Sequence, residues 1–283
     1  MPPPPDLMDE LVEEVLLRLP LDSPAHLAGA ALVCRRWWRL VSGAAFRRRL
    51  RDLHRESPML GFLCNLRDAC LTHLARFVPT TTSTFSPRAG DHPWGWRADD
   101  ARHGRVLLSR HHVLMVWDPI TDHFQELPVL PWPVYSYRAA ILCAADAACD
   151  HLDCHRGGPF LVVYIGVGHV GAFSCVYSSD AAAWSKPASV QFRLVDCLNF
   201  VQSVLVGKAL YFMFHRNNEV LEFDLKLCQV VSVIKLPPYT HWLRALLTTT
   251  EDGGLGFAAA IEHKLCLWSR KDGSKGDDAT GWI

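Results

Sequence analysis

Apolar residues recur every three or four positions along the first fifty residues, a period typical of amphipathic helices. We expect the first helix from about Asp6, which can cap it, to Leu19, because Pro20 ends it. Ser23-Pro24 opens a second helix that runs to Leu40, and a third covers Ala44 to Leu53. The pattern therefore predicts three short helices.

After Ser57-Pro58 the apolar period becomes two, and short apolar runs alternate with Gly, Pro, Asp and Asn. This pattern predicts an antiparallel all-β domain. The expected strands are Met59–Cys64, Arg105–Leu108, Val113–Trp117, Phe160–Ile165, Ala172–Tyr177, Ser203–Val206, Ala209–Phe214, Val220–Phe223, Gln229–Ile234, Leu255–Ala260 and Lys264–Trp268.

A repeat emerges when the strands are aligned on an aromatic residue that ends a strand and leads into a polar turn. The aligned residues are Trp117, Tyr177, Phe223 and Trp268. Their spacing is about 45 residues once an insert at Cys143–Gly157 is removed, a period typical of propeller blades. We predict a propeller-like domain of about five blades, incomplete because Gly281-Trp282-Ile283 reads as the start of a strand.

The expected organisation is α+β and multidomain. We assign residues 1–5 to a disordered proline tail, 6–57 to a helical domain and 58–283 to the propeller-like domain, truncated at its C-terminus. The chain has 283 residues, 49% of them hydrophobic, so it can bury a core and is not intrinsically disordered. Its formal net charge of zero argues against a nucleic-acid partner.

Other sequence features bear on location and on the first domain's partners. No apolar stretch is long enough to span a membrane and no signal peptide precedes Asp6, so we expect a cytoplasmic or nuclear protein. Acids gather in the first predicted helix and arginines in the next two, where they can neutralise each other. Three helices this short leave apolar surface uncovered, which predicts a protein partner.

The first fifty residues resemble a known module. L-M-D-E-L-V-E-E-V-L-L-R-L-P, followed by V-C-R-R-W-W-R-L-V and Phe46, is similar to the F-box, the helical module by which substrate receptors dock on the Skp adaptor of cullin-RING ubiquitin ligases. The resemblance implies that one set of residues forms the docking surface or the small core beneath it: Leu7, Met8, Leu11, Val15, Leu16, Leu19, Pro20, Val33 and Trp37.

One position departs from the F-box pattern. Met8 stands where most F-boxes have proline; methionine is flexible and apolar, so we expect docking with altered affinity. An alternative for the whole set is that these residues are only the core of a helical cap on the larger domain.

The second domain is similar to the kelch-like, F-box-associated propellers of plant F-box proteins, particularly those of grasses, through G-R-V-L-L and V-W-D-P-I-T. The two resemblances together imply a non-enzymatic substrate receptor of an SCF-type ubiquitin ligase. It would bind the Skp adaptor, through it the cullin, and an unknown protein substrate through propeller loops. The alternative is a propeller scaffold or small-molecule sensor outside any ligase.

Other candidate chemistry is weaker. Five residues could supply zinc ligands but match no standard spacing, so we expect no metal there: Cys143, Cys149, His151, Cys154 and His155. Gly166 to Gly171 matches G-x-G-x-x-G, yet the following residues read as a strand rather than the helix a dinucleotide needs. No catalytic motif is present, and we predict neither a cofactor nor an active site.

Overall fold

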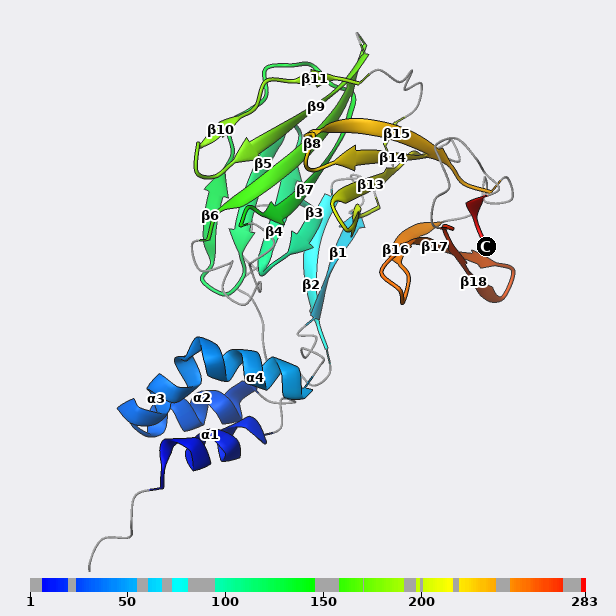
Figure 1. Cartoon of the computed structure of the whole chain (residues 1–283). Helices are drawn as coiled ribbons and strands as arrows, with labels where there is room; N and C mark the ends of the chain where they lie inside the picture. The colour runs from blue at the N-terminus through cyan, green and yellow to red at the C-terminus, as the bar shows by residue number, and fades with distance from the viewer. Residues whose placement is uncertain are drawn as a thin grey trace, which may run out of the picture. The chain divides into compact units, whose positions relative to one another are not determined.

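The structure is a computed structural model, and its contacts divide the chain into two compact units, residues 1–95 and 96–283 (Figure 1). The domain boundary expected after residue 57 stays a prediction. The described residues are 7–19, 24–54, 61–67, 73–80, 95–145, 158–169, 171–190, 197–198, 201–215, 219–237, 245–271 and 281–283.

The described residues of the first unit form four helices, where the sequence predicts three. They are α1 (Asp9–Leu17), α2 (Pro24–Val33), α3 (Arg35–Ser42) and α4 (Ala44–His54). The predicted second helix is divided at Cys34, which is extended, with φ −158° and ψ 163°. The Trp37 amide donates to Cys34 Sγ at 3.5 Å and the Trp38 amide to the Cys34 carbonyl at 3.0 Å, so Cys34 caps a new helix.

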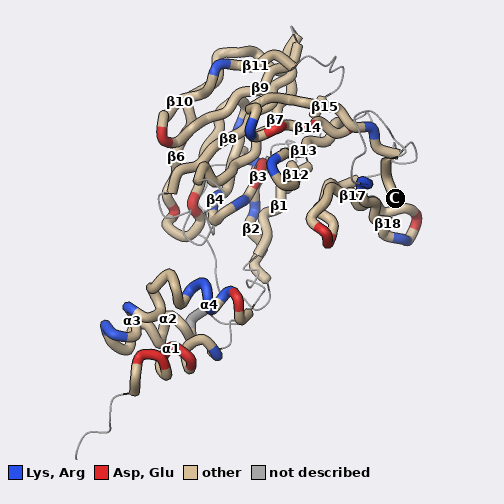
Figure 2. Tube along the Cα trace, viewed as in Figure 1, with Lys and Arg blue, Asp and Glu red and all other residues tan. Residues whose placement is uncertain are grey.

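The helices pack around a small apolar core. Val12, Leu16, Leu17 and Phe46 are buried in it. Figure 2 shows acidic residues on α1 and arginines on α3 and α4. Arg49 pairs with Glu13 at 2.7 Å and with Glu14 at 3.2 Å. The charges that the sequence segregates therefore neutralise each other between helices, as predicted. The first unit also contains an antiparallel hairpin, β1 (Gly61–Arg67) with β2 (His73–Pro79).

The second unit consists of consecutive antiparallel sheets, which confirms the antiparallel prediction. Sheet 1 contains β3 (Arg97–Arg102), β4 (Arg105–Arg110), β5 (Val113–Asp118) and β6 (His123–Glu126). Sheet 2 contains β7 (Ser136–Cys143), β8 (Phe160–Gly168), β9 (Gly171–Ser178), β10 (Ala183–Trp184) and β11 (Ala188–Ser189), with β11 paired to β9.

Sheets 3 and 4 continue the same order along the chain. Sheet 3 contains β12 (Val204–Val206), β13 (Ala209–Met213), β14 (Glu219–Asp224) and β15 (Gln229–Lys235). Sheet 4 contains β16 (Leu246–Thr249), β17 (Leu255–Ile261) and β18 (Lys264–Ser269). Trp282 bridges to Arg270 beside the end of β18. The described strands do not form a closed ring.

The aromatic residues that defined the sequence repeat all lie in the third strand of their sheets. The exposed fractions of Trp117, Tyr177 and Phe223 are 1%, 2% and 0%, and Trp268 is half-buried against Phe257. The residue after the aromatic shapes the turn that follows: Asp118 accepts from the amide of Ile120, and Asp224 from that of Lys226. The repeat therefore combines one core position with one turn position.

Five residues after the aromatic, each described turn contains a residue with positive φ. These residues are Asp122 (59°), Ala182 (50°) and Cys228 (52°). A β-carbon makes this left-handed conformation unfavourable, and alanine has no side-chain hydrogen bond to compensate.

Ala182→Gly should therefore stabilise the protein by up to about 1 kcal/mol, because glycine adopts positive φ without a steric cost. The matched control, Ala181→Gly, should instead destabilise it by about 0.5–1 kcal/mol, since the neighbouring position does not have positive φ and gains only unfolded-state entropy. Urea unfolding curves measure both changes. Equal effects of the two substitutions would contradict this account of the turn.

Neighbouring sheets pack face to face. Leu107 and Val116 of sheet 1 pack with Ile141 and Val162 of sheet 2. The opposite face of sheet 2 packs on sheet 3 in a core that includes Ile165 and Phe223. Sheet 3 then packs on sheet 4 in a core that includes Val220 and Phe257. The outer face of sheet 4 is exposed at Leu246, Leu265 and Leu267.

A buried carboxylate connects the first three sheets. Asp100 on β3 accepts from the Ile141 amide of β7 at 2.9 Å and from Gln202 Nε2, just before β12, at 2.8 Å. Arg102 Nε lies 3.4 Å from Asp100 Oδ1. Burial raises the pKa of the Asp100 carboxyl above its usual range, and the positive charge of Arg102 opposes that rise.

Arg102→Met should destabilise the second unit by roughly 3 kcal/mol, because Asp100 would then be buried without its counter-charge. The double variant Asp100→Asn/Arg102→Met should recover part of that loss, since it removes the uncompensated charge. Urea unfolding followed by tryptophan fluorescence measures both. Strictly additive losses in the double variant would show that the two side chains do not interact.

Candidate partner-binding site

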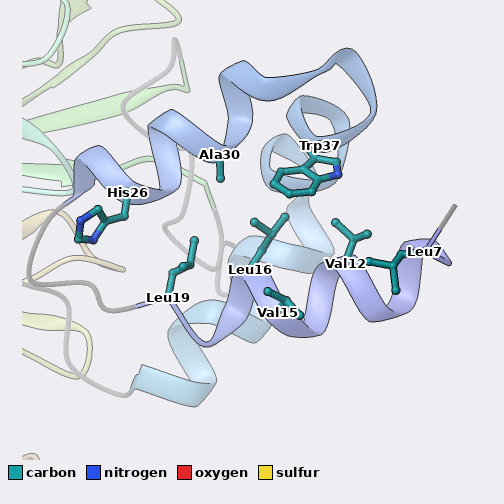
Figure 3. A pocket seen from close by; sticks show the side chains of 8 residues that line it. All are labelled: Leu7, Val12, Val15, Leu16, Leu19, His26, Ala30 and Trp37. Carbon is teal, nitrogen blue, oxygen red and sulfur yellow. The ribbon is translucent and has the colours of Figure 1, made fainter. Parts of the chain in front are cut away.

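An apolar groove lies between α1 and the α2–α3 pair and has a volume of about 550 Å³ (Figure 3). One wall comes from α1 and its ends, and the other comes from α2 and from Trp37 on α3. Figure 3 shows Leu16 directed toward the second wall. The lining residues are Leu7, Val12, Val15, Leu16, Leu19, His26, Ala30 and Trp37.

The sequence of α1 places two apolar rows side by side. Val12 and Leu16, four residues apart, are buried at 4% and 2% exposure. The neighbouring row, Leu11 and Val15, is exposed at 48% and 62%. Full burial of one such side chain is worth about 1.5–3 kcal/mol, so the exposed row is a surface on which a partner would gain affinity.

The structure divides the predicted docking residues into two groups. Leu16 is buried, and Leu19 and Trp37 are half-buried against the core. The remaining described residues are exposed, with fractions of 48% or more: Leu7, Met8, Leu11, Val15 and Val33. Pro20 lies outside the described residues. The set therefore contains both a surface and the core beneath it.

Sequence reasoning omitted three lining residues. Val12 was detectable, since it stands four residues before Leu16 on the same helix face. His26 and Ala30 are also four residues apart, on α2, but most of that helix is apolar. An apolar helix gives no sequence signal for which face lines a groove.

The N-terminus of α1 is held by backbone and arginine contacts, and Asp6, the predicted cap, lies outside the described residues. Met8 occupies the N-cap position, and its carbonyl accepts from the amides of Leu11 and Val12 at 3.1 Å. Arg36 on α3 pairs with Asp9 and also donates to the Leu7 carbonyl. These contacts fix the exposed row of α1 against α3, although each exposed ion pair contributes little stability.

The composition of the groove favours a protein partner over a small ligand. Pockets for small molecules combine apolar walls with several polar groups that orient the ligand. Among the described lining residues, the polar groups are the His26 imidazole and the indole N–H of Trp37. Aliphatic side chains surrounded by charged residues are instead typical of a protein interface.

The other candidate sites of the sequence fall elsewhere. Cys143 ends β7, whereas Cys149, His151, Cys154 and His155 lie outside the described residues; within the described part no group of metal-binding side chains occurs. The glycine motif from Gly166 to Gly171 belongs to the β8–β9 hairpin, where Gly168 pairs with Gly171. A hairpin has no helix N-terminus to receive a phosphate.

Among the helices that the structure describes, none has the length and apolar character required to cross a membrane.

Comparisons with known proteins do not identify a family. No family model matches the chain, and no curated protein matches it. A crystal structure of a mitotic checkpoint complex is 13% identical over 59% of this chain and 46% of that one, with a TM-score of 0.35. The dihydro-heme d1 dehydrogenase NirN, in complex with DHE, is 11% identical over 76% of this chain and 43% of that one, with a TM-score of 0.41.

The chain thus spans less than half the length of either matched structure, and both TM-scores are below 0.5. Neither likeness carries an argument about fold or function.

Leu16→Ala should destabilise the helical part of the chain by about 2–5 kcal/mol, because it leaves a cavity in a small core. Val15→Ala, the matched control on the exposed row, should change stability by less than about 0.5 kcal/mol. Thermal unfolding followed by circular dichroism at a helix-sensitive wavelength compares the two. A similar loss for both would mean that the exposed row is part of the core.

Proposed function

We propose that this chain is the substrate receptor of an SCF-type ubiquitin ligase and docks on the Skp adaptor through the exposed row of α1 and the adjoining groove. The observation that carries the proposal is that Leu11 and Val15 of α1 are exposed, as are Leu7 and Met8 directly before this helix. A domain this small lacks the apolar mass to cover that row itself.

The supporting evidence from the sequence is the F-box-like order of residues around the same surface. The residues to which the resemblance assigns docking include those that are exposed along the groove. Met8, exposed at 64%, lies where most F-boxes have proline. Its flexible side chain loses more conformational freedom on binding than proline would, so we expect a weaker adaptor complex than proline would give at this position.

We further propose that the four sheets are blades of a β-propeller. Every sheet is an antiparallel meander with its aromatic residue in the third strand. First strands of neighbouring sheets lie against each other in two cases, β3 with β7 and β12 with β16. That arrangement is expected when blades share a central axis.

In this function the chain performs no chemistry. It holds a protein substrate near the ubiquitin carrier of the cullin complex, and the gain is a higher effective concentration of substrate lysines. The ligase would act in the cytoplasm or nucleus.

The test is co-expression with a Skp-type adaptor, followed by size-exclusion chromatography. The wild type should co-elute with the adaptor, whereas Leu11→Asp/Val15→Asp should not, because two buried carboxylates would face the apolar interface without partners. Both positions are exposed, so the variant should keep its fold.

Leu53→Asp is the matched control, since Leu53 is similarly exposed at 57% but lies on α4 outside the groove. It should co-elute like the wild type. If the folded wild type fails to bind the adaptor, the ligase proposal is wrong and the scaffold or sensor alternative takes its place.

A further inference from the structure

Three segments of sheets 1 and 2 meet at one end of these sheets. They are the β4–β5 turn with Arg110, the β6–β7 connection (127–135) and the β8–β9 turn. They share that end because consecutive strands of a meander run in opposite directions, so the second turn and the connection to the next sheet fall on the same side. We call these three segments the aromatic loop surface.

Hydrogen bonds and close backbone packing hold the segments together. The Tyr135 amide donates to the Val167 carbonyl at 3.0 Å, and the Tyr137 hydroxyl donates to the His111 carbonyl at 2.6 Å. At Gly168 a β-carbon would lie 2.7 Å from the Pro133 carbonyl oxygen, so only glycine allows the connection to approach this closely. The surface is therefore built into the fold rather than being a loose loop.

The connection exposes side chains that are costly to leave in water. Val129, Trp132 and Tyr135 are exposed at 56%, 36% and 49%. The two aromatic rings are already held by neighbouring rings. Trp132 contacts Phe173 edge-on, with ring centroids 5.3 Å apart, and the ring centroids of Tyr135 and His169 are 5.4 Å apart. Pro128, Pro131 and Pro133 restrict the backbone, which lowers the entropy lost when a partner binds.

The three segments carry positive charge and no carboxylate. Their ionisable side chains other than Tyr135, among the described residues, are Arg110, His111, His112 and His169; Glu126, which ends β6 directly before the connection, is an exposed carboxylate beside them. Arg110 is exposed, with its guanidinium 5.0 Å from the ring of Trp96. The opposite end of the same two sheets carries Asp118, Asp122 and Asp180 alongside Arg102, His103, Arg105 and His123.

We propose that the aromatic loop surface binds an acidic segment of a protein partner in which a carboxylate neighbours an aromatic or aliphatic side chain. Trp132 and Tyr135 provide the apolar contact, and tryptophan, tyrosine and arginine are the residue types that dominate binding energy at interfaces. Arg110 provides the charge complement. The inference rests on the proposed receptor function, because it names the class of substrate.

The experiment selects peptides from a random library displayed on phage, using the full chain as bait. The selected peptides should be enriched in Asp or Glu next to Phe, Trp or Leu. Labelled synthetic copies should bind Trp132→Ala/Tyr135→Ala about tenfold or more weakly than the wild type in fluorescence anisotropy. Arg110→Glu should also bind them more weakly, and raising the salt concentration should weaken wild-type binding.

Lys226→Glu is the matched control, because it makes the same charge reversal in the β14–β15 turn, away from this surface. It should bind the peptides as the wild type does. The proposal is overturned if the library yields no binder, if the selected peptides lack acidic residues, or if the aromatic double variant and Arg110→Glu both bind them normally.

Adaptor co-elution, measured on the same variants, separates this inference from the receptor function. The Trp132→Ala/Tyr135→Ala variant should still co-elute with the adaptor but should no longer bind the peptides. If the chain selects acidic peptides at this surface but binds no adaptor, the ligase function is wrong and the acidic-segment site stands.

Discussion

The second unit depends on one constraint: an antiparallel sheet with two apolar faces has to bury both. Along β7, Ala139 and Ile141 face sheet 1, whereas Ala140 and Leu142 face sheet 3. The same alternation continues in β8. Each inner sheet is therefore packed between its neighbours in the chain, and the order of sheets in space follows their order in sequence.

The helical part of the chain is also shaped by the need to bury apolar surface, but it buries only part of that surface. Its described helices bury Val12, Leu16, Leu17 and Phe46, whereas Leu11 and Val15, the next row of α1, stay exposed. Ion pairs such as that of Arg49 with Glu13 hold α1 in place without covering it. A structural core and an exposed apolar row thus arise from adjacent stripes of one helix.

The polar groups of the sheets fix the connections between them. Asp100 receives hydrogen bonds from the segments that begin two other sheets, through Ile141 and Gln202. Because an unpaired carboxylate at this depth would be strongly unfavourable, these donors stabilise the packing of the three sheets. At the end of the sheets, Gly168 and Tyr137 likewise fix the β6–β7 connection, and this brings Trp132 and Tyr135 beside the basic β4–β5 turn.

Many of the strands and turns could be predicted from the sequence, because they depend on residues close together in the chain. Every predicted strand overlaps a strand of the structure, because period-two apolar runs bounded by turn residues are a local signal. The aromatic repeat was also readable, since Trp117, Tyr177 and Phe223 combine a core position with an adjacent turn. Seven described strands were missed: β2, β3, β6, β7, β10, β11 and β16. Strand β3 reads R-A-D-D-A-R, and its polar side chains are accommodated only by partners such as Gln202 and Ser203. The helix break at Cys34 was missed because the apolar period continues through it.

The sequence by itself determined the apolar periods, the turns and the two classes of domain, since each of these depends on residues close together in the chain. Only the tertiary structure decided which of two neighbouring rows on α1 is core and which is surface, because that depends on where Phe46 and Trp37 pack. It also decided that Arg110, Trp132 and His169 meet at one end of two sheets. Residues so far apart in the sequence come together through strand pairing and sheet packing, and a local sequence pattern does not predict either.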